Sequence, residues 1–189
     1  AEAFGVKVIS IGFLVKDGQP LIWRGPLLHS TIRQFITDVN WGELDYLIVD
    51  LPPGTGDVQL SLAQIVPLSG GVIVTLPQKV SLDDARRSLE MFRKLNVPII
   101  GVIENMSYLD LQNGRRMEIF GSGGGKHLAE SSGVPFLGEV PLAANVRVSG
   151  DNGNPIILAE PESKPAKILK EIALALAARI SVETLRKKS

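Results

Sequence analysis

Residues 46–57 combine a carboxylate with a loop rich in proline and glycine, in the order Tyr-Leu-Ile-Val-Asp-Leu-Pro-Pro-Gly-Thr-Gly-Asp. The apolar run before Asp50 predicts a strand that is buried on both faces, as in the middle of a parallel sheet. Asp50 would then lie at the carboxyl end of that strand, where open α/β sheets bind ligands, and its carboxylate could hold Mg²⁺ through water. This arrangement is typical of a Walker-B strand with its switch loop, and the alternative is an ordinary buried strand that ends in a turn.

The loop after Asp50 supplies groups that suit a nucleotide phosphate. Two prolines end the strand, and the glycines allow the backbone to approach a ligand closely, so that Gly54, Thr55 and Gly56 are candidates for sensing a terminal phosphate. Asp57 is a candidate for a role at the attacking water, and the N-cap of the following helix is the alternative for it.

Several further residues follow predicted strands and therefore fall on the same edge of the sheet. Gln78 follows Pro77, and Asn105 follows Glu104 at the end of the next strand, where an amide with one acceptor and two donors suits the edge of adenine. Pro141 and Leu142 end a later strand, where backbone groups can face a base. The alternatives are a solvated loop amide for Gln78 and a local turn for Asn105, and the pattern alone favours the turn.

Other polar or glycine positions leave their roles open. Glycines 123–125 either bind an anion at the start of a short helix or form a flexible joint. Arg147 and Asp151 are predicted to lie in a loop. His29 and His127 are isolated from each other and are interpreted as surface or packing residues.

Strand patterns alternate with helical patterns along the chain. The alternation predicts an α/β fold with right-handed crossovers and a mainly parallel sheet that carries helices on both faces, within a single domain over residues 1–189. A capping-box-like start is predicted at Ser81, with Asp84 in place of glutamate. The expected strands cover residues 6–15, 46–50, 71–77, 97–103 and 135–140, and the expected helices cover residues 26–39, 57–66, 81–95, 126–131 and 166–180.

The alternation of strand and helix patterns is interrupted between residues 105 and 125. Residues 108–120 are centred on Asn113-Gly114, and this pair predicts a projecting β-hairpin with a type I′ turn. The hairpin could serve a partner or a dimer interface, and a structural excursion without a partner is the alternative.

Composition narrows the function classes. The 189 residues include 20 Lys plus Arg and 20 Asp plus Glu, so no electrostatic argument supports a nucleic-acid or membrane-surface binder. No apolar run approaches the roughly 20 residues of a membrane helix, and a cytoplasmic protein is expected. The chain contains no cysteine, which excludes disulfides, thiolate catalysis and cysteine-ligated metal within these residues.

A phosphate loop of the form Gly-x-x-x-x-Gly-Lys-Ser/Thr is absent from the sequence. A Walker-B strand without this loop is half of a nucleotide site. We therefore expect the sequence to be an N-terminally shortened piece of a longer protein, and we expect this chain alone to hydrolyse ATP negligibly.

Several motifs together resemble the Mrp/ApbC family of MinD-like P-loop ATPases, which carry iron–sulfur clusters. The resemblance extends over nearly the whole chain and implies that it is the C-terminal two-thirds or so of a MinD-like ATPase domain. The motifs are Trp23-Arg-Gly-Pro26, residues 50–57, Pro77-Gln78, Glu104-Asn-Met-Ser-Tyr108, Phe120-Gly-Ser-Gly-Gly-Gly125 and Pro135-Phe-Leu-Gly-Glu-Val-Pro-Leu142.

The resemblance implies a homodimer that binds and slowly hydrolyses ATP with Mg²⁺ and that passes clusters to apo iron–sulfur proteins. Asp50 would be the Walker-B residue, Gly54 would lie in the switch loop, and Asn105 would recognise adenine, with Pro141 and Leu142 nearby. Many members hold a bridging [4Fe–4S] cluster through a Cys-x-x-Cys pair after the Asn-Met-Ser-Tyr motif.

The present sequence departs from that pattern, because Leu-Asp-Leu-Gln-Asn-Gly-Arg-Arg follows Tyr108 without any cysteine. Cyanobacterial and plastid-type members also lack the pair, which makes the plastid stroma an alternative location. The leading hypothesis is an ATP-binding iron–sulfur cluster carrier, and the alternative is a MinD/ParA-like switch or scaffold that carries no cluster. A metabolic enzyme of the same class, such as a synthetase, has no supporting set of substrate residues.

Overall fold

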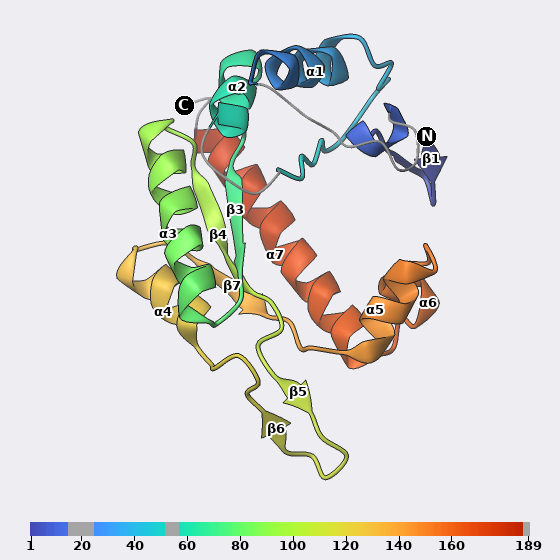
Figure 1. The fold of residues 1–189 in the computed structure, drawn as a ribbon, viewed down its shortest axis with the longest axis vertical. Coiled ribbons are helices and arrows are strands. Elements are labelled where there is room, and N and C mark those ends of the chain that lie inside the picture. Colours follow the sequence, from blue (N-terminus) through green and yellow to red (C-terminus); the bar gives the residue numbers. More distant parts are fainter. Residues whose placement is uncertain (15–24, 52–56, 187–189) are drawn as a thin grey trace. The chain divides into compact units, whose positions relative to one another are not determined.

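The computed structural model describes residues 1–14, 25–51 and 57–186 (Figure 1). The chain forms two compact units, residues 1–67 and residues 68–189, and each is described by itself. Gly54 and the rest of the predicted switch loop lie outside the described residues, as does the predicted turn over residues 16–20.

A three-stranded parallel sheet forms the centre of the second unit, in the order β3-β4-β7. The register sets Thr75 opposite Glu104, and Glu104 opposite Glu139, so the three carboxyl ends form one row. β4 is paired on both edges, and its apolar side chains form part of the core. The strands are β3 (Gly71–Thr75), β4 (Ile99–Glu104) and β7 (Phe136–Glu139).

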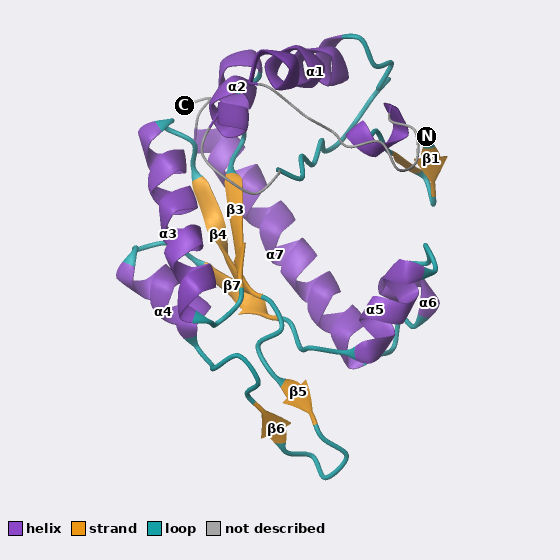
Figure 2. Cartoon of the chain, in the orientation of Figure 1, coloured by secondary structure: helices purple, strands orange, loops and turns teal. Residues whose placement is uncertain are grey.

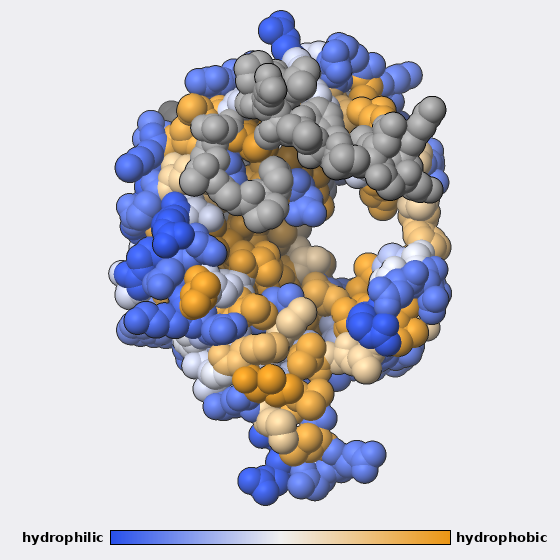
Figure 3. Space-filling model, in the orientation of Figure 1, coloured by the Kyte–Doolittle hydropathy of each residue, from blue (hydrophilic) through white to orange (hydrophobic). Residues whose placement is uncertain are grey.

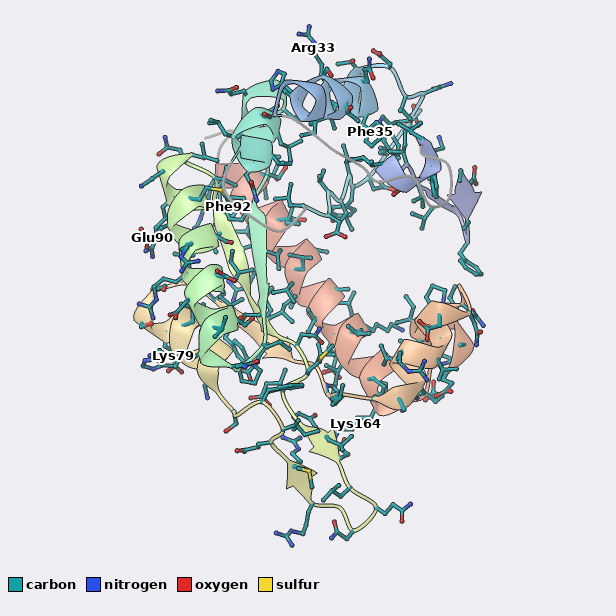
Figure 4. The ribbon with its side chains drawn as sticks, in the orientation of Figure 1. Arg33, Phe35, Lys79, Glu90, Phe92 and Lys164 are labelled. Atoms are coloured by element: carbon teal, nitrogen blue, oxygen red, sulfur yellow. The ribbon has the colours of Figure 1, made fainter. Side chains whose placement is uncertain are left out.

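Helices cover both faces of this sheet, as the sequence predicts (Figure 2). Helices α3 (Lys79–Lys94) and α4 (Gly124–Ser131) lie on one face, and α7 (Lys164–Arg186) lies on the other. Two same-sense crossovers from β3 to β4 to β7 place their helices on the same side, which explains the arrangement. The contacts are close: a Cβ built on Gly71 would lie 2.7 Å from the ring of Phe92, which Figure 4 shows on α3 beside the sheet.

The starts of the helices differ from the prediction by a few residues. The α3 helix begins at Lys79 with Gln78 as its N-cap, so the capping box predicted at Ser81 is wrong. Ser81 instead bonds the end of β3, because its Oγ accepts the Leu76 N–H at 3.0 Å. The α4 helix begins within the glycines, and α7 is longer at both ends than predicted.

Two helices were not predicted, namely α5 (Ala144–Asp151) and α6 (Ile156–Ala159). The prediction of a loop at Arg147 and Asp151 is therefore wrong. These two residues lie one turn apart on α5 and form an ion pair of 2.5 Å, a spacing that supports a helix.

The β-hairpin is present, but its turn differs from the predicted type. Strands β5 (Leu109–Asp110) and β6 (Arg116–Met117) pair antiparallel. Of the two central residues, only Gly114 has a positive φ, whereas a type I′ turn requires two. The Gly114 N–H donates to the Leu111 carbonyl at 3.0 Å, which gives a three-residue loop that ends in a left-handed glycine.

The first unit contains a short hairpin and two helices. β1 (Glu2–Ala3) pairs antiparallel with β2 (Val6–Lys7), and a 3₁₀ turn, η1 (Ile11–Leu14), follows. The prediction of one long strand over residues 6–15 is therefore wrong for residues 6–14, and residue 15 lies outside the described residues. Phe4 and Gly5 both have positive φ, and this tight turn pairs β2 with the residues before it. Helices α1 (Gly25–Thr37) and α2 (Asp57–Ile65) confirm two of the predicted helices.

The strand predicted at residues 46–50 is not formed. This segment has no regular structure, and its side chains are exposed, with Ile48 at 85%. A buried strand needs neighbours that accept its backbone hydrogen bonds and cover its faces. In residues 1–14, 25–51 and 57–67 of the first unit, no strand pairs with it.

No helix in the described part of the chain combines the length and the apolar character required to cross a bilayer.

Candidate nucleotide site at the carboxyl edge of the sheet

Backbone hydrogen bonds continue beyond the ends of the three strands and hold the following residues together. The Asn105 N–H donates to the Thr75 carbonyl at 2.7 Å, and the Val140 N–H donates to the Glu104 carbonyl at 2.8 Å. The Ser107 N–H returns to the Val140 carbonyl at 3.0 Å. The predicted residues Gln78, Asn105, Pro141 and Leu142 therefore all follow strands at one edge, where ligands bind in α/β sheets.

Asn105 has its side chain oriented by the backbone. Its Oδ1 accepts the N–H of Met106 at 3.0 Å, and Met106 has a positive φ of 51°. A left-handed backbone at a non-glycine residue costs free energy and is often found at functional sites. In the described part of the chain, no group accepts a hydrogen bond from the Asn105 Nδ2, so this donor is available to a ligand. The local hydrogen bond and a ligand contact are thus compatible in this geometry.

Pro141 and Leu142 lie directly beyond β7. Pro141 is buried and lacks an N–H group, and the Leu142 N–H donates to the Tyr108 carbonyl at 2.8 Å. That donor is therefore used within the chain. Neither residue therefore offers a free backbone N–H to a base, and their part in base recognition remains a prediction.

Gln78 occupies the N-cap position of α3, but its side chain makes no capping hydrogen bond and is exposed. Its carbonyl accepts the Leu82 N–H at 3.0 Å, which continues the helix to its first turn. The side chain of Gln78 is therefore exposed at the start of α3, just beyond the end of β3.

Glu104 is a fully buried acid at the centre of this edge, with an exposed fraction of 0%. Its carboxylate accepts three hydrogen bonds: Oε1 from the Ser107 hydroxyl and the Gly123 N–H (3.3 Å), and Oε2 from the Gly125 N–H (2.5 Å). Backbone N–H groups at the start of α4 thus satisfy the carboxyl oxygens where water cannot reach them.

The glycines at the start of α4 allow this close approach. A Cβ on Gly125 would lie 3.0 Å from the Cβ of Glu104, and a Cβ on Gly124 would lie 2.7 Å from the Pro77 carbonyl oxygen. Of the two alternatives for residues 123–125, the anion cradle is present, and the anion is the chain's own Glu104.

Charged groups surround the buried ring of Tyr108 at the base of the hairpin. The Arg116 guanidinium lies 3.8 Å from the ring centroid, and the Lys164 ammonium lies 5.0 Å from it. Lys164 also donates to Asp110 at 2.6 Å, and this hydrogen bond raises the pKa of Lys164. Figure 4 shows Lys164 at the start of α7, beside the hairpin. These contacts connect β5 and β6 to the body of the second unit.

A polar pocket of about 240 Å³ lies beside the hairpin. Ser107 and Gly123 form part of its wall, and both are hydrogen-bonded to Glu104. The other lining residues are Tyr108, Arg116, Glu118, Ser122 and Glu139.

The predicted phosphate and metal residues belong to the first unit. Asp50 is exposed in the irregular segment before the switch loop, and Asp57 is the first residue of α2. Across the described residues, no group of three or more His, Cys, Asp or Glu side chains could hold a metal ion. The assignments of Asp50, Gly54 and Asp57 remain predictions.

Sequence reasoning did not identify Glu104, Ser107 or Ser81 as structural residues of this edge. One signal was present, because Glu104 is the only charged residue in the run Ile99-Ile-Gly-Val-Ile-Glu104. Buried acids are normally paired or hydrogen-bonded. The glycines that bond Glu104 are 19 and 21 positions away, so spacing could not connect them.

Comparison with protein families gives a match to the model described as "ParA: NUBPL iron-transfer P-loop NTPase" over residues 1–177. The chain is 57% identical over 185 residues to an iron–sulfur cluster carrier protein of Deinococcus radiodurans, covering 97% of this chain and 52% of that protein. It is 44% identical over 178 residues to the iron–sulfur cluster transfer protein NUBPL of Mus musculus, covering 94% and 56%. The chain thus spans about half the length of the curated relatives it matches.

The solved structures that are similar to the chain include two that hold ADP. A nucleotide-binding protein from Archaeoglobus fulgidus in complex with ADP has a TM-score of 0.67 at 35% identity, covering 84% of this chain and 60% of that one. The septum site-determining protein MinD from Pyrococcus horikoshii, complexed with Mg-ADP, has a TM-score of 0.56 at 22% identity, covering 82% and 55%. The second likeness shows the fold alone.

Proposed function

Because the chain belongs to the family of NUBPL-type iron-transfer P-loop NTPases, with a MinD-like fold, we propose that its full-length protein is an ATP-binding iron–sulfur cluster carrier. ATP hydrolysis would drive a switch in a homodimer, and apo iron–sulfur proteins would receive the cluster. The relatives named iron–sulfur cluster carrier or transfer protein support this proposal. The protein would act in the cytoplasm, or in the plastid stroma if its source is a plant or an alga.

The observation that carries the nucleotide part of the proposal is the side chain of Asn105. Its oxygen is fixed by the Met106 N–H, its Nδ2 is available, and Gln78, Pro141 and Leu142 lie on the same edge of the sheet. An amide donor in this position suits an acceptor nitrogen on the edge of adenine. We assign Asn105 to base recognition, with the other three residues beside the base.

The phosphate part of the proposal assigns Asp50 to Mg²⁺ through water, Gly54 to the terminal phosphate and Asp57 to the attacking water. Bound Mg²⁺ would neutralise charge on the phosphates, and catalysis would consist of positioning and charge stabilisation. The 189 residues contain no Walker-A lysine, so the chain alone should hydrolyse ATP negligibly.

The cluster is cargo in this proposal, and the chain offers no thiolate for it, since it contains no cysteine. The ligands would have to come from other residues in a longer polypeptide or from a partner. This absence favours one second candidate, a MinD/ParA-like ATPase switch or scaffold that carries no cluster.

Two experiments on the full-length protein test these proposals. Calorimetric titration should show ATP bound more tightly than GTP, with at least a tenfold loss of ATP affinity in Asn105→Ala. Equal binding of both nucleotides would contradict the role of Asn105. Anaerobic reconstitution with iron and sulfide should give visible absorption and acid-labile sulfide, and their absence would favour the scaffold.

A further inference from the structure

The segment from Glu104 to Gly123, whose ends are 19 positions apart in the sequence, begins and ends at one buried carboxylate. It contains Asn105, the hairpin and the return to α4. On the outgoing side the Ser107 hydroxyl donates to Glu104 Oε1, and on the returning side the Gly123 N–H donates to the same oxygen. We call these contacts, together with the Gly125 N–H bond, the Glu104 anchor.

From this geometry we propose that Glu104 is a positioning residue that couples occupation of the nucleotide site at Asn105 to the conformation of the hairpin. The inference rests on the proposed nucleotide site. It adds a residue that contacts neither the base nor the phosphates, and it gives the projecting hairpin a physical connection to that site.

The connection is short on the nucleotide side. Asn105 is the next residue after Glu104, and its N–H is fixed to Thr75 at 2.7 Å. A ligand that forms a hydrogen bond with the Asn105 side chain can therefore shift the peptide group between Glu104 and Asn105. Because the Glu104 side chain is fully buried and accepts three hydrogen bonds, it has little freedom to absorb a shift of its backbone.

The connection is also direct on the hairpin side. Ser107 and Tyr108 begin the outgoing leg, and both are at most 5% exposed. Their movement would carry the buried Tyr108 ring, which lies against Arg116 of β6 and Lys164 of α7. A shift at Glu104 therefore reaches both legs of the hairpin.

Alternative partners for the Glu104 carboxylate are lacking in the described part of the chain, since no Lys or Arg forms an ion pair with it. Its hydrogen bonds go to backbone N–H groups and one hydroxyl. An amide of the same shape can keep the bond to Gly125 but presents an NH₂ group to the remaining donors. Glu104→Gln is thus a conservative variant that changes the anchor while nearly preserving its volume.

The test is hydrogen–deuterium exchange of the full-length protein with and without ATP, followed by mass spectrometry, with ATP affinity measured on the same samples. In the wild type, ATP should slow exchange in peptides over residues 107–123 at least threefold. In Glu104→Gln, ATP should still bind within about fivefold of the wild-type affinity, but the protection of residues 107–123 should be lost. Glu130→Gln, a change in an exposed acid of α4, is the matched control and should behave as the wild type.

A second variant keeps the proposal testable if Glu104→Gln does not fold. Ser107→Ala removes only the hydrogen bond from the Ser107 hydroxyl to Glu104 Oε1. It should reduce the ATP-dependent protection of residues 107–123 less than Glu104→Gln does. ATP binding without slower exchange over residues 107–123 in the wild type, or full protection in both variants, would overturn the coupling alone. Failure of the wild type to bind ATP would overturn the proposed nucleotide site together with this inference.

Discussion

Two segments of the chain share one sequence pattern and have opposite structures. Tyr46-Leu-Ile-Val-Asp50 and Ile99-Ile-Gly-Val-Ile-Glu104 are both apolar runs that end in an acid. The second is β4, paired with strands on both edges, and its acid is fully buried. The first has no regular structure, and Ile48 and Asp50 are exposed. An apolar run that ends in an acid can thus form a buried strand, but it does so only where neighbouring strands pair with it.

Glu104 and Asp50, the acids that end the two segments, should differ most in their contribution to the free energy of unfolding. Glu104→Ala should lower the free energy of unfolding by about 3–5 kcal/mol, because it leaves buried donors without an acceptor. Asp50→Ala, the matched control, should change it by less than about 0.5 kcal/mol, since Asp50 is exposed. Urea unfolding of this chain measures both values. Equal effects would contradict the structural difference between the two acids.

The valines within the runs give the next contrast. Val102→Ala should cost about 2 kcal/mol, because Val102 is fully buried, whereas Val49→Ala should be nearly neutral, because Val49 is 41% exposed. The same two variants should be measured in the full-length protein, where the difference between the two segments would disappear if residues 46–50 gain partner strands. In that case Val49→Ala should also cost about 2 kcal/mol in urea unfolding.

The close approach of the glycines to the end of β3 should have a smaller effect. Gly124→Ala should cost about 1–2 kcal/mol, because its Cβ would lie 2.7 Å from the Pro77 carbonyl oxygen. Gly150→Ala on α5 is the control, since nothing lies within 4 Å of its Cβ, and it should be neutral or slightly stabilising. The midpoint of thermal unfolding separates the two. A neutral Gly124→Ala would show that the start of α4 can move away from the sheet.

The exposed pair at the base of the hairpin should have the smallest effect. Asp110 raises the pKa of Lys164, so the stability that Lys164 contributes is present at neutral pH and is lost as the pH rises through that raised pKa. Lys164→Met should cost less than about 1 kcal/mol at pH 7, because both side chains are about half exposed. The difference from wild type in urea unfolding should shrink at strongly alkaline pH, and a growing difference would contradict the assignment.

The sequence predicted the central sheet well, because its strands have partners within the same 122-residue unit. Apolar spacing also identified the inward face of α3, where Ala85, Leu89 and Phe92 are buried. Helices α5 and α6 were missed since they are short and carry few buried side chains. The prediction of a strand at residues 46–50 was wrong. An apolar run indicates a segment that can be buried, but it does not indicate whether partner strands are present.

At the site, the sequence could place Asn105, Gln78, Pro141 and Leu142 on one edge, since each follows a strand. It could not identify the hydrogen bonds from Gly123 and Gly125 to Glu104, because they join residues that lie 19 and 21 positions apart in separate elements. The roles of Asp50, Gly54 and Asp57 remain predictions, as does the single-domain organisation.

The closure of the hairpin at its base has a consequence for variation between relatives. The tip, residues 112–115, is exposed and hydrophilic and projects from the second unit (Figure 3). Because the two legs are already joined at Glu104, extra residues at the tip would extend a closed loop, and doubling the length of a flexible loop costs only about 0.6 kcal/mol. The tip is therefore a place where insertions can change the surface that the protein presents while the sheet and its carboxyl edge keep their geometry.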